Sequence, residues 1–372
     1  MKRLALLLPA LCLAQPNPRV GFYQWAGSTA GAGSGDLLTR ARERIRPTGA
    51  GLLRFYLGAR FDYVHPVLSP RRFAELRQPT PAAILQLPRY RAALEDPLLP
   101  TLVLTTYPSI DYGAGPDDIN LLRPWTGREE KQEYSQMFEL AEFLLRRYGT
   151  LDKTIVLSNA EADDKLLEVM NYTGSPELAM LNLEAWQNTR FRAVEDARRK
   201  NPKSRLKLLI AFEISLVNLK IRRLGDRFIR HPEGRWNALG NLVPRVRFDL
   251  LSYSSYESTN SPYETGLINT PAEQVGVRLR RDLNLLRKAV PTPIMIGELG
   301  FARELFDGLP GGGISERLAS AQAAIEQARP ALVVFWQVFD APPEGRDPVQ
   351  FGLLDPRRPA QAGLVRFISS FR

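Results

Sequence analysis

Pro293-Ile294-Met295-Ile296-Gly297-Glu298-Leu299-Gly300 is the segment of this chain that points most clearly to a fold class. A proline opens it, an apolar run follows, and glycines flank a single carboxylate at its end. A strand this apolar is covered on both faces, which is typical of the parallel sheets of α/β proteins. The C-terminal tips of such strands meet in the catalytic pocket of a (β/α)8 barrel. We therefore expect Glu298 to face a pocket.

Further apolar segments alternate with helical patterns along the rest of the chain. They predict strands at residues 19–25, 51–57, 101–107, 154–159, 206–212, 247–253 and 331–336. Alternation of strands and helices predicts a parallel sheet, and eight such units predict a closed ring. The sequence therefore predicts one domain over residues 19–372, a single (β/α)8 TIM barrel of the α/β class with elaborated βα loops. An open doubly wound sheet is the alternative, and it would need no eighth unit.

The composition is that of an ordinary globular protein, with 44% hydrophobic and 24% charged residues, which excludes a disordered chain. The net charge of +10 raises the question of a nucleic-acid or anionic partner. The basic residues are scattered, however, and no long basic run occurs. We therefore expect a solvated basic surface and no nucleic-acid partner. The sequence carries no signal for the oligomeric state.

The N-terminus has the pattern of a secretory signal peptide. A basic start precedes an apolar run at residues 4–13, and small residues end at Ala14. This pattern predicts a signal peptide over residues 1–14, cleaved after Ala14, and a secreted or periplasmic protein. Leu11 is too large for the usual lipobox, which argues against a lipoprotein anchor at Cys12. Cys12 is the only cysteine, and no other segment approaches the roughly 20 apolar residues of a membrane-spanning helix.

The predicted strand ends carry side chains suited to sugar chemistry. The set comprises Arg54, Tyr107, Asn159, Glu161, Glu213, Tyr253, Tyr256, Glu298 and Trp336. Hydrolysis of a glycosidic bond needs one carboxyl group to protonate the leaving oxygen and another to meet the anomeric carbon. Aromatic faces bind the apolar side of a sugar ring. We expect Glu161 and Glu298 to be the catalytic pair, and Glu213 to be a subsite or structural residue. The residues expected to bind the substrate are Arg54, Tyr107, Asn159, Tyr253, Tyr256 and Trp336.

The chain resembles the large clan of retaining (β/α)8 glycoside hydrolases. Ile296-Gly297-Glu298-Leu299-Gly300 matches the seventh-strand pattern, and Val333-Val334-Phe335-Trp336-Gln337 matches the eighth. The resemblance implies that Glu298 is the nucleophile and Glu161 the acid/base, and that Trp336 floors the sugar site. It also implies that Arg54 and a tyrosine near the sixth strand, Tyr253 or Tyr256, belong to the pocket, since strand parity decides which tyrosine faces inward.

One departure from the clan pattern concerns the acid/base. The usual Asn-Glu pair is Asn159-Ala160-Glu161 here, with one residue inserted. Both side chains enter the pocket only if the strand end bulges or turns, and Asp163 is the first substitute to consider. The altered spacing motivates an alternative function, a non-catalytic carbohydrate-binding or scaffold barrel derived from a glycosidase.

Other chemistries find little support in the sequence. His65 and His231 are the only histidines and lie in separate segments without ligand spacing, so we expect no metal site. The glycine-rich segment at residues 26–35 lacks the spacing of a phosphate-binding loop, and we expect no cofactor. A carbohydrate substrate is the expected partner. The net charge leaves open an enzyme of anionic glycans, which clustered basic residues near the pocket would favour.

Overall fold

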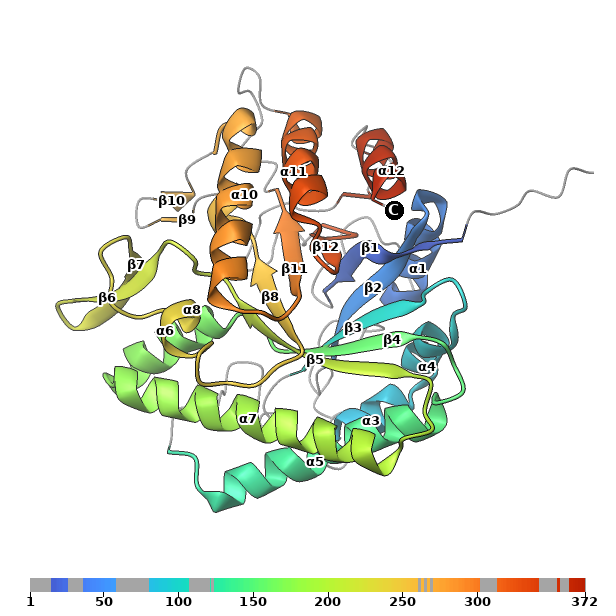
Figure 1. Cartoon of the computed structure of the whole chain (residues 1–372), viewed down its shortest axis with the longest axis horizontal. Helices are drawn as coiled ribbons and strands as arrows, with labels where there is room; N and C mark the ends of the chain where they lie inside the picture. Colours follow the sequence, from blue (N-terminus) through green and yellow to red (C-terminus); the bar gives the residue numbers. More distant parts are fainter. Residues whose placement is uncertain are drawn as a thin grey trace, which may run out of the picture.

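The computed structural model describes residues 15–25, 36–57, 80–106, 121, 124–259, 262–263, 266–267, 270–301, 313–340, 353–354 and 361–371. Eight strands of these residues form a closed barrel in which every pairing is parallel (Figure 1). The prediction of a (β/α)8 barrel is confirmed, and an open sheet is excluded. The expected signal peptide with Cys12, the segment 26–35, His65 and Tyr107 lie outside the described residues.

All eight predicted strands are present. They are β1 (Asn17–Gln24), β2 (Ala50–Leu57), β3 (Thr101–Thr106), β4 (Thr154–Ser158), β5 (Lys207–Ile214), β8 (Leu250–Ser254), β11 (Ile294–Gly300) and β12 (Val333–Trp336). β2, β3 and β11 are buried along their whole length. Side chains fill the inside of the barrel and helices cover its outside, which explains why these strands are apolar without alternation.

Helices surround the barrel (Figure 1). They are α1 (Leu37–Ile45), α3 (Pro81–Leu85), α4 (Pro88–Glu95), α5 (Gly127–Arg147), α6 (Ala162–Thr173), α7 (Pro176–Lys200), α10 (Ala272–Ala289), α11 (Ile314–Ala328) and α12 (Gln361–Ser370). Local signals start several of them: Thr126 forms a capping box with Glu129, and the Ser175 hydroxyl accepts from the Leu178 N–H. None of the helices in the described ranges combines the length and the apolar character needed to cross a bilayer.

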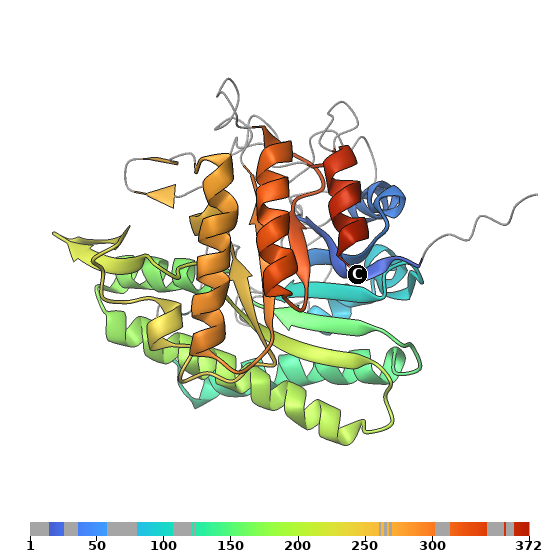
Figure 2. The same cartoon turned by 45° about the horizontal axis from the view of Figure 1, so that its top comes forward.

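The segment from residue 216 to 243, one of the elaborated βα loops, has regular secondary structure of its own. It contains an antiparallel hairpin of β6 (Lys220–Leu224) and β7 (Arg227–His231), followed by the short helix α8 (Ala238–Asn241). Figure 2 shows this hairpin extending outward from the barrel. Gly225 takes a positive φ of 62° at the tip, a conformation that glycine adopts at little cost. The many charges of both strands hide the alternation that would have predicted them.

Candidate active site

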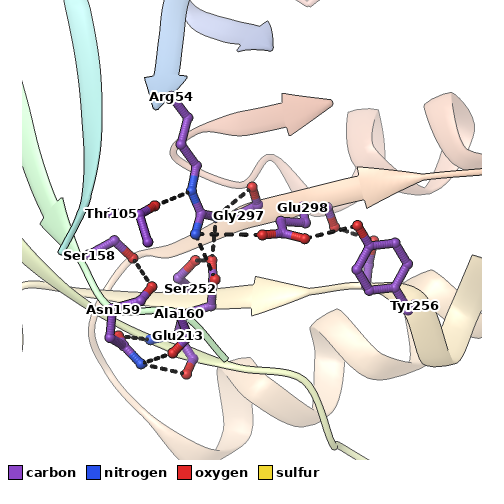
Figure 3. Close-up of polar contacts among 11 residues, drawn as sticks. Arg54, Thr105, Ser158, Asn159, Ala160, Glu213, Ser252, Tyr256, Gly297 and Glu298 are labelled. Atoms are coloured by element: carbon purple, nitrogen blue, oxygen red, sulfur yellow. Dashed lines mark hydrogen bonds and ion pairs between the residues drawn. The ribbon is translucent and has the colours of Figure 1, made fainter. Parts of the chain in front are cut away.

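A buried ion pair between Arg54 and Glu213 crosses the inside of the barrel (Figure 3). Arg54 on β2 donates from Nη1 to Glu213 Oε2 at 2.6 Å and from Nη2 to Glu213 Oε1 at 2.8 Å. It also donates to Thr105 Oγ1 and to the Gly297 carbonyl, both at 2.9 Å, while Ser252 Oγ donates to Glu213 Oε2 at 2.7 Å. Because both charges are fully buried, these bonds offset their desolvation. Arg54 is therefore held rigidly inside the barrel.

Gly297 makes room for this ion pair. A Cβ atom at this position would lie 2.0 Å from Glu213 Oε2 and 2.2 Å from Ser252 Oγ. In a regular strand the next residue, Glu298, would point to the opposite face. The register of β11 with β8 shifts between Ile296 and Glu298, and such bulges re-aim side chains. Glu298 consequently reaches the same pocket as the ion pair.

One hydrogen bond and one ion pair hold the Glu298 carboxylate (Figure 3). Tyr256, in the short helix α9 (Tyr256–Thr259), donates its hydroxyl proton to Oε2 at 2.8 Å, and Arg54 Nη2 lies 3.6 Å from Oε1. Burial raises the pKa of Glu298 to about 8; Arg54 and the Tyr256 hydrogen bond act to lower it, whereas the charge of Glu213 raises it. Arg54 and Tyr256 therefore favour the ionised form of Glu298, whereas burial favours the protonated form.

Glu161 follows β4 and occupies the N-cap position of α6, where its side chain makes no capping bond. Its Oε1 is buried and has no hydrogen-bond partner within the described part of the chain. Burial raises the pKa of Glu161 well above its usual range, and the charges of Asp164 and Glu298 raise it further, while Arg230 opposes them. Since the charge of Glu298 acts on Glu161, both carboxyl groups belong to one electrostatic environment. The two surroundings differ, because Tyr256 and Arg54 contact the Glu298 carboxylate whereas the buried Oε1 of Glu161 has no such partner among the described residues.

Asp163, the substitute that the sequence left open, has a structural role. Its Oδ2 accepts from the backbone N–H groups of Ser215 and Leu216 at 2.9 and 3.0 Å, and its Oδ1 accepts from Ala238 at 2.7 Å. The side chain is fully buried, and burial raises the pKa of Asp163 to about 6 although these bonds act to lower it. Asp163 therefore joins α6 to the segment after β5 and has no carboxylate oxygen left for a substrate.

Asn159 also has a different role from the substrate contact we expected. Its amide oxygen accepts from the Glu213 N–H at 2.7 Å, and its amide nitrogen donates to the carbonyls of Glu213 and Ala160 at 3.1 and 2.5 Å (Figure 3). The side chain is fully buried. Asn159 thus extends the contact between the ends of β4 and β5 and positions Glu213.

The expectation that Tyr253 lines the pocket is wrong. Its hydroxyl donates to Asp282 Oδ2 on α10 at 2.9 Å, on the outer side of the barrel. The neighbouring Ser252 contacts Glu213 inside the barrel, so strand alternation turns Tyr253 outward. Tyr256, which contacts Glu298, is the tyrosine in the pocket.

Aromatic rings gather at the ends of β1 and β12. Trp336 is half-buried and meets Tyr23 edge-to-face, with ring centroids 4.7 Å apart. The half-buried Trp25 lies 6.2 Å from Trp336, and the guanidinium of Arg54 lies 4.4 Å above the Tyr23 ring. Tyr23 and Trp25 were missed as site residues, although both lie at the end of a predicted strand. Within the described ranges, no group of three or more His, Cys, Asp and Glu side chains is arranged to hold a metal ion.

No protein-family model matches the chain, and no curated protein is similar to it in sequence. Solved structures are similar in fold. A double mutant of the Cellulomonas fimi endo-β-1,4-mannanase matches with a TM-score of 0.54 and 15% identity, over 95% of this chain and 71% of the mannanase. A hyperthermophilic β-glucosidase from Pyrococcus furiosus matches with a TM-score of 0.55 and 12% identity, over 96% of each chain. At these identities the likeness concerns the fold: the chain shares the (β/α)8 architecture of these two glycoside hydrolases over nearly its whole length.

Proposed function

We propose that the protein is a glycoside hydrolase that cleaves O-glycosidic bonds of a carbohydrate with retention of configuration. The observation that carries the proposal is the contrast between the surroundings of two carboxyl groups that interact electrostatically, one directly after β4 and the other near the end of β11. Glu298 receives a hydrogen bond from Tyr256 and lies beside Arg54, whereas Glu161 has a buried oxygen without a partner in the described residues. Environments that treat two carboxyl groups differently allow one to act as nucleophile and the other as acid.

In the first step, the ionised Glu298 attacks the anomeric carbon and forms a glycosyl ester. The bond between this carbon and the leaving oxygen breaks, and the leaving oxygen takes the proton of Glu161. Tyr256 and Arg54 hold the attacking carboxylate in place, which lowers the entropic cost of reaching the transition state. The raised pKa of Glu161 favours the protonated form that this step requires.

In the second step, Glu161 is ionised and accepts a proton from water. The water oxygen attacks the anomeric carbon, the ester bond breaks, and Glu298 leaves as a carboxylate. Two inversions at the same carbon give net retention. The half-buried indole of Trp336 supports binding of the sugar, because an aromatic face covers the apolar side of a pyranose.

Export of the chain is part of the same proposal. Its support is the sequence pattern alone: a basic start, an apolar run and small residues ending at Ala14. Expression of the full chain with periplasmic and culture fractions collected separately tests it. We expect a mature protein whose N-terminal sequence begins at Gln15, and a protein retained in the cytoplasm with Met1 in place contradicts it.

Activity against aryl glycosides and polysaccharides tests the enzymatic proposal. Glu298→Gln should reduce kcat by on the order of 10⁴-fold or more, because it removes the covalent nucleophile. Glu161→Gln should reduce kcat by roughly 10² to 10⁴-fold on polysaccharides, and by less on nitrophenyl glycosides, whose leaving groups depart without a proton.

Glu168→Gln is the matched control, since Glu168 lies on α6 and pairs with Lys165 at 3.1 Å away from the pocket. This variant should retain the activity of the unmodified protein. Normal turnover by Glu298→Gln would contradict the nucleophile assignment. Binding of oligosaccharides without any hydrolysis by the unmodified protein would favour the alternative, a carbohydrate-binding barrel.

A further inference from the structure

The hairpin of β6 and β7 is fixed at the edge of the barrel, against α6. It follows β5, the strand that carries Glu213, and extends past α6 (Figures 1 and 2). At its base, the Glu257 carboxylate accepts from the backbone N–H groups of residues 217–219 at 2.8 to 3.1 Å. Further out, the Phe228 N–H donates to Asn171 Oδ1 of α6 at 2.7 Å. The hairpin is therefore held as a rigid arm.

An ion pair connects this arm to the proposed acid. Arg230 of β7 lies 2.5 Å from Asp164 in the first turn of α6. Asp164 raises and Arg230 lowers the pKa of Glu161, so both lie within electrostatic reach of that carboxyl group. Glu161, the N-cap residue of the same helix, protonates the leaving oxygen in the proposed mechanism, so this ion pair places the hairpin near the leaving-group end of the site.

The hairpin is strongly basic. Residues 220–236 hold six basic side chains, namely Lys220, Arg222, Arg223, Arg227, Arg230 and Arg235, against the acidic Asp226 and Glu233. Arg222 lies 3.6 Å from the highly exposed Glu233 and 3.5 Å from the ring nitrogens of His231. Within the described part of the chain, Lys220 and Arg227 form no ion pair. Most of this charge is therefore not neutralised by the protein.

Strand alternation places three of the basic side chains on one face. Residues directly opposite each other in the hairpin share a face, and the pairs of interest are Lys220 with His231, Arg222 with Ile229, and Leu224 with Arg227. Phe228 and Arg230, whose ring and guanidinium belong to the other face, are the residues that contact α6. The face with Lys220, Arg222 and Arg227 is thus turned away from α6. We call it the basic face.

We propose that the basic face binds carboxylate or sulfate groups of an anionic polysaccharide, on the leaving-group side of the bond that is cleaved. The position of that bond rests on the proposed function. A chain charged at every unit, such as a nucleic acid, would bring anions next to the ionised Glu298 and to Asp164, which repel them. A glycan with spaced acidic groups places an uncharged linkage at the carboxyl pair and an acidic group on the hairpin.

Binding of three polymers with one backbone tests the proposal: hydroxyethyl cellulose, carboxymethyl cellulose and cellulose sulfate. The full chain with Glu298→Gln is used, so that turnover does not obscure binding. We expect one or both anionic polymers to bind about tenfold more tightly than the neutral one at low salt, with the difference shrinking as salt screens it. The two anionic arms distinguish a carboxylate from a sulfate as the preferred group.

Two double variants with the same loss of charge locate the binding surface. Arg222→Gln with Arg227→Gln should remove most of the preference for the anionic polymers. Arg287→Gln with Lys288→Gln is the control, because these exposed residues end α10 directly before β11 begins, at the opposite end of the barrel. The control should keep the preference within about twofold, since interactions between exposed charges fade beyond a Debye length.

The proposal would be overturned if both double variants lost the preference for the anionic polymers equally, or if the protein showed no such preference. Tighter binding of a single-stranded DNA oligonucleotide that depends on the same two arginines would also overturn it. Binding that depends on the hairpin in a protein without hydrolytic activity would leave this inference standing and reject only the enzymatic function. Suppose instead that the unmodified protein hydrolyses neutral glycans, that the hairpin variant does so equally well, and that no preference for anionic polymers is found. The enzymatic function would then stand, and this inference would be rejected.

Discussion

Glu213 competes with Glu298 for the charge of Arg54. Glu213 takes two hydrogen bonds from the guanidinium, at 2.6 and 2.8 Å, whereas Glu298 lies 3.6 Å from it. The negative charge of Glu213 also raises the pKa of Glu298. The buried ion pair therefore secures the geometry of the pocket while leaving the proposed nucleophile harder to ionise.

Glu213→Gln should move the acid limb of the pH profile of kcat/KM to lower pH, by about one unit. Two effects of the same sign act here: Glu298 loses a negative neighbour, and Arg54 becomes available to it. The variant should also lose roughly 3 kcal/mol of unfolding free energy, because it breaks a buried ion pair. Kinetics across pH and urea unfolding measure the two effects.

Ser252→Ala is the companion variant, since it removes a hydrogen bond to Glu213 and keeps every charge. Its acid limb should stay where it is in the unmodified protein. An acid limb that moves to higher pH in Glu213→Gln would show that the ion pair assists ionisation of Glu298, contrary to our account.

Helix α6 connects the pocket to the segment after β5. Its first turn contains Asp163, which accepts from three backbone N–H groups of that segment. Asp163→Asn leaves buried donors facing an amide group, so the variant should lose about 3 kcal/mol of unfolding free energy. Asp164→Asn, at a partly exposed ion pair, should cost less than about 1 kcal/mol. Urea unfolding of both variants compares them, and equal stability of the two would contradict the structural role of Asp163.

At the scale of elements, the sequence predicts what depends on apolar burial and misses what depends on tertiary contacts. The eight barrel strands are apolar runs, and α5 and α7 start with clear capping residues. Helix α6 was not predicted, because Glu161 stands at its N-cap without a capping bond. The orientation of Glu298 depends on a bulge in β11, which the residues of that strand do not reveal.

The candidate site follows the same division. The order of strands in a barrel brings Arg54, Glu161, Glu213 and Glu298 to one end, and this much could be predicted from the strand ends alone. Of the two tyrosines near the sixth barrel strand, Tyr256 contacts Glu298, whereas side-chain alternation along β8 turns Tyr253 outward to Asp282. Asn159 has its amide bound to the backbone, a contact between β4 and β5 that no local pattern encodes.

For the whole molecule, the burial of Glu161 lowers the free energy of unfolding at pH values above the ordinary pKa of a carboxyl group. The folded state raises the pKa of Glu161, so between its unfolded and folded values the native protein binds more protons than the unfolded chain. Stability is therefore lost as pH rises through this window, and nothing is lost below it. Glu161→Gln should raise Tm by roughly 2 °C or more near pH 7, and should have no effect near pH 3.5.

Thermal unfolding at both pH values checks this expectation. Glu168→Gln, on the same helix but at a surface ion pair, should change Tm little at either pH. A lower Tm for Glu161→Gln near pH 7 would mean that the Glu161 carboxylate makes a stabilising contact in the folded protein, and the assignment of a proton to it would fail.

The most direct test of the central claim is the configuration of the first sugar released, followed by proton NMR on a substrate found in the activity panel. Attack by Glu298 followed by water, with Glu161 serving both steps, predicts that the anomeric configuration of the substrate appears first and that the other anomer grows in later by mutarotation. Initial appearance of the inverted anomer would show a single displacement by water, and would contradict the role of Glu298 as nucleophile.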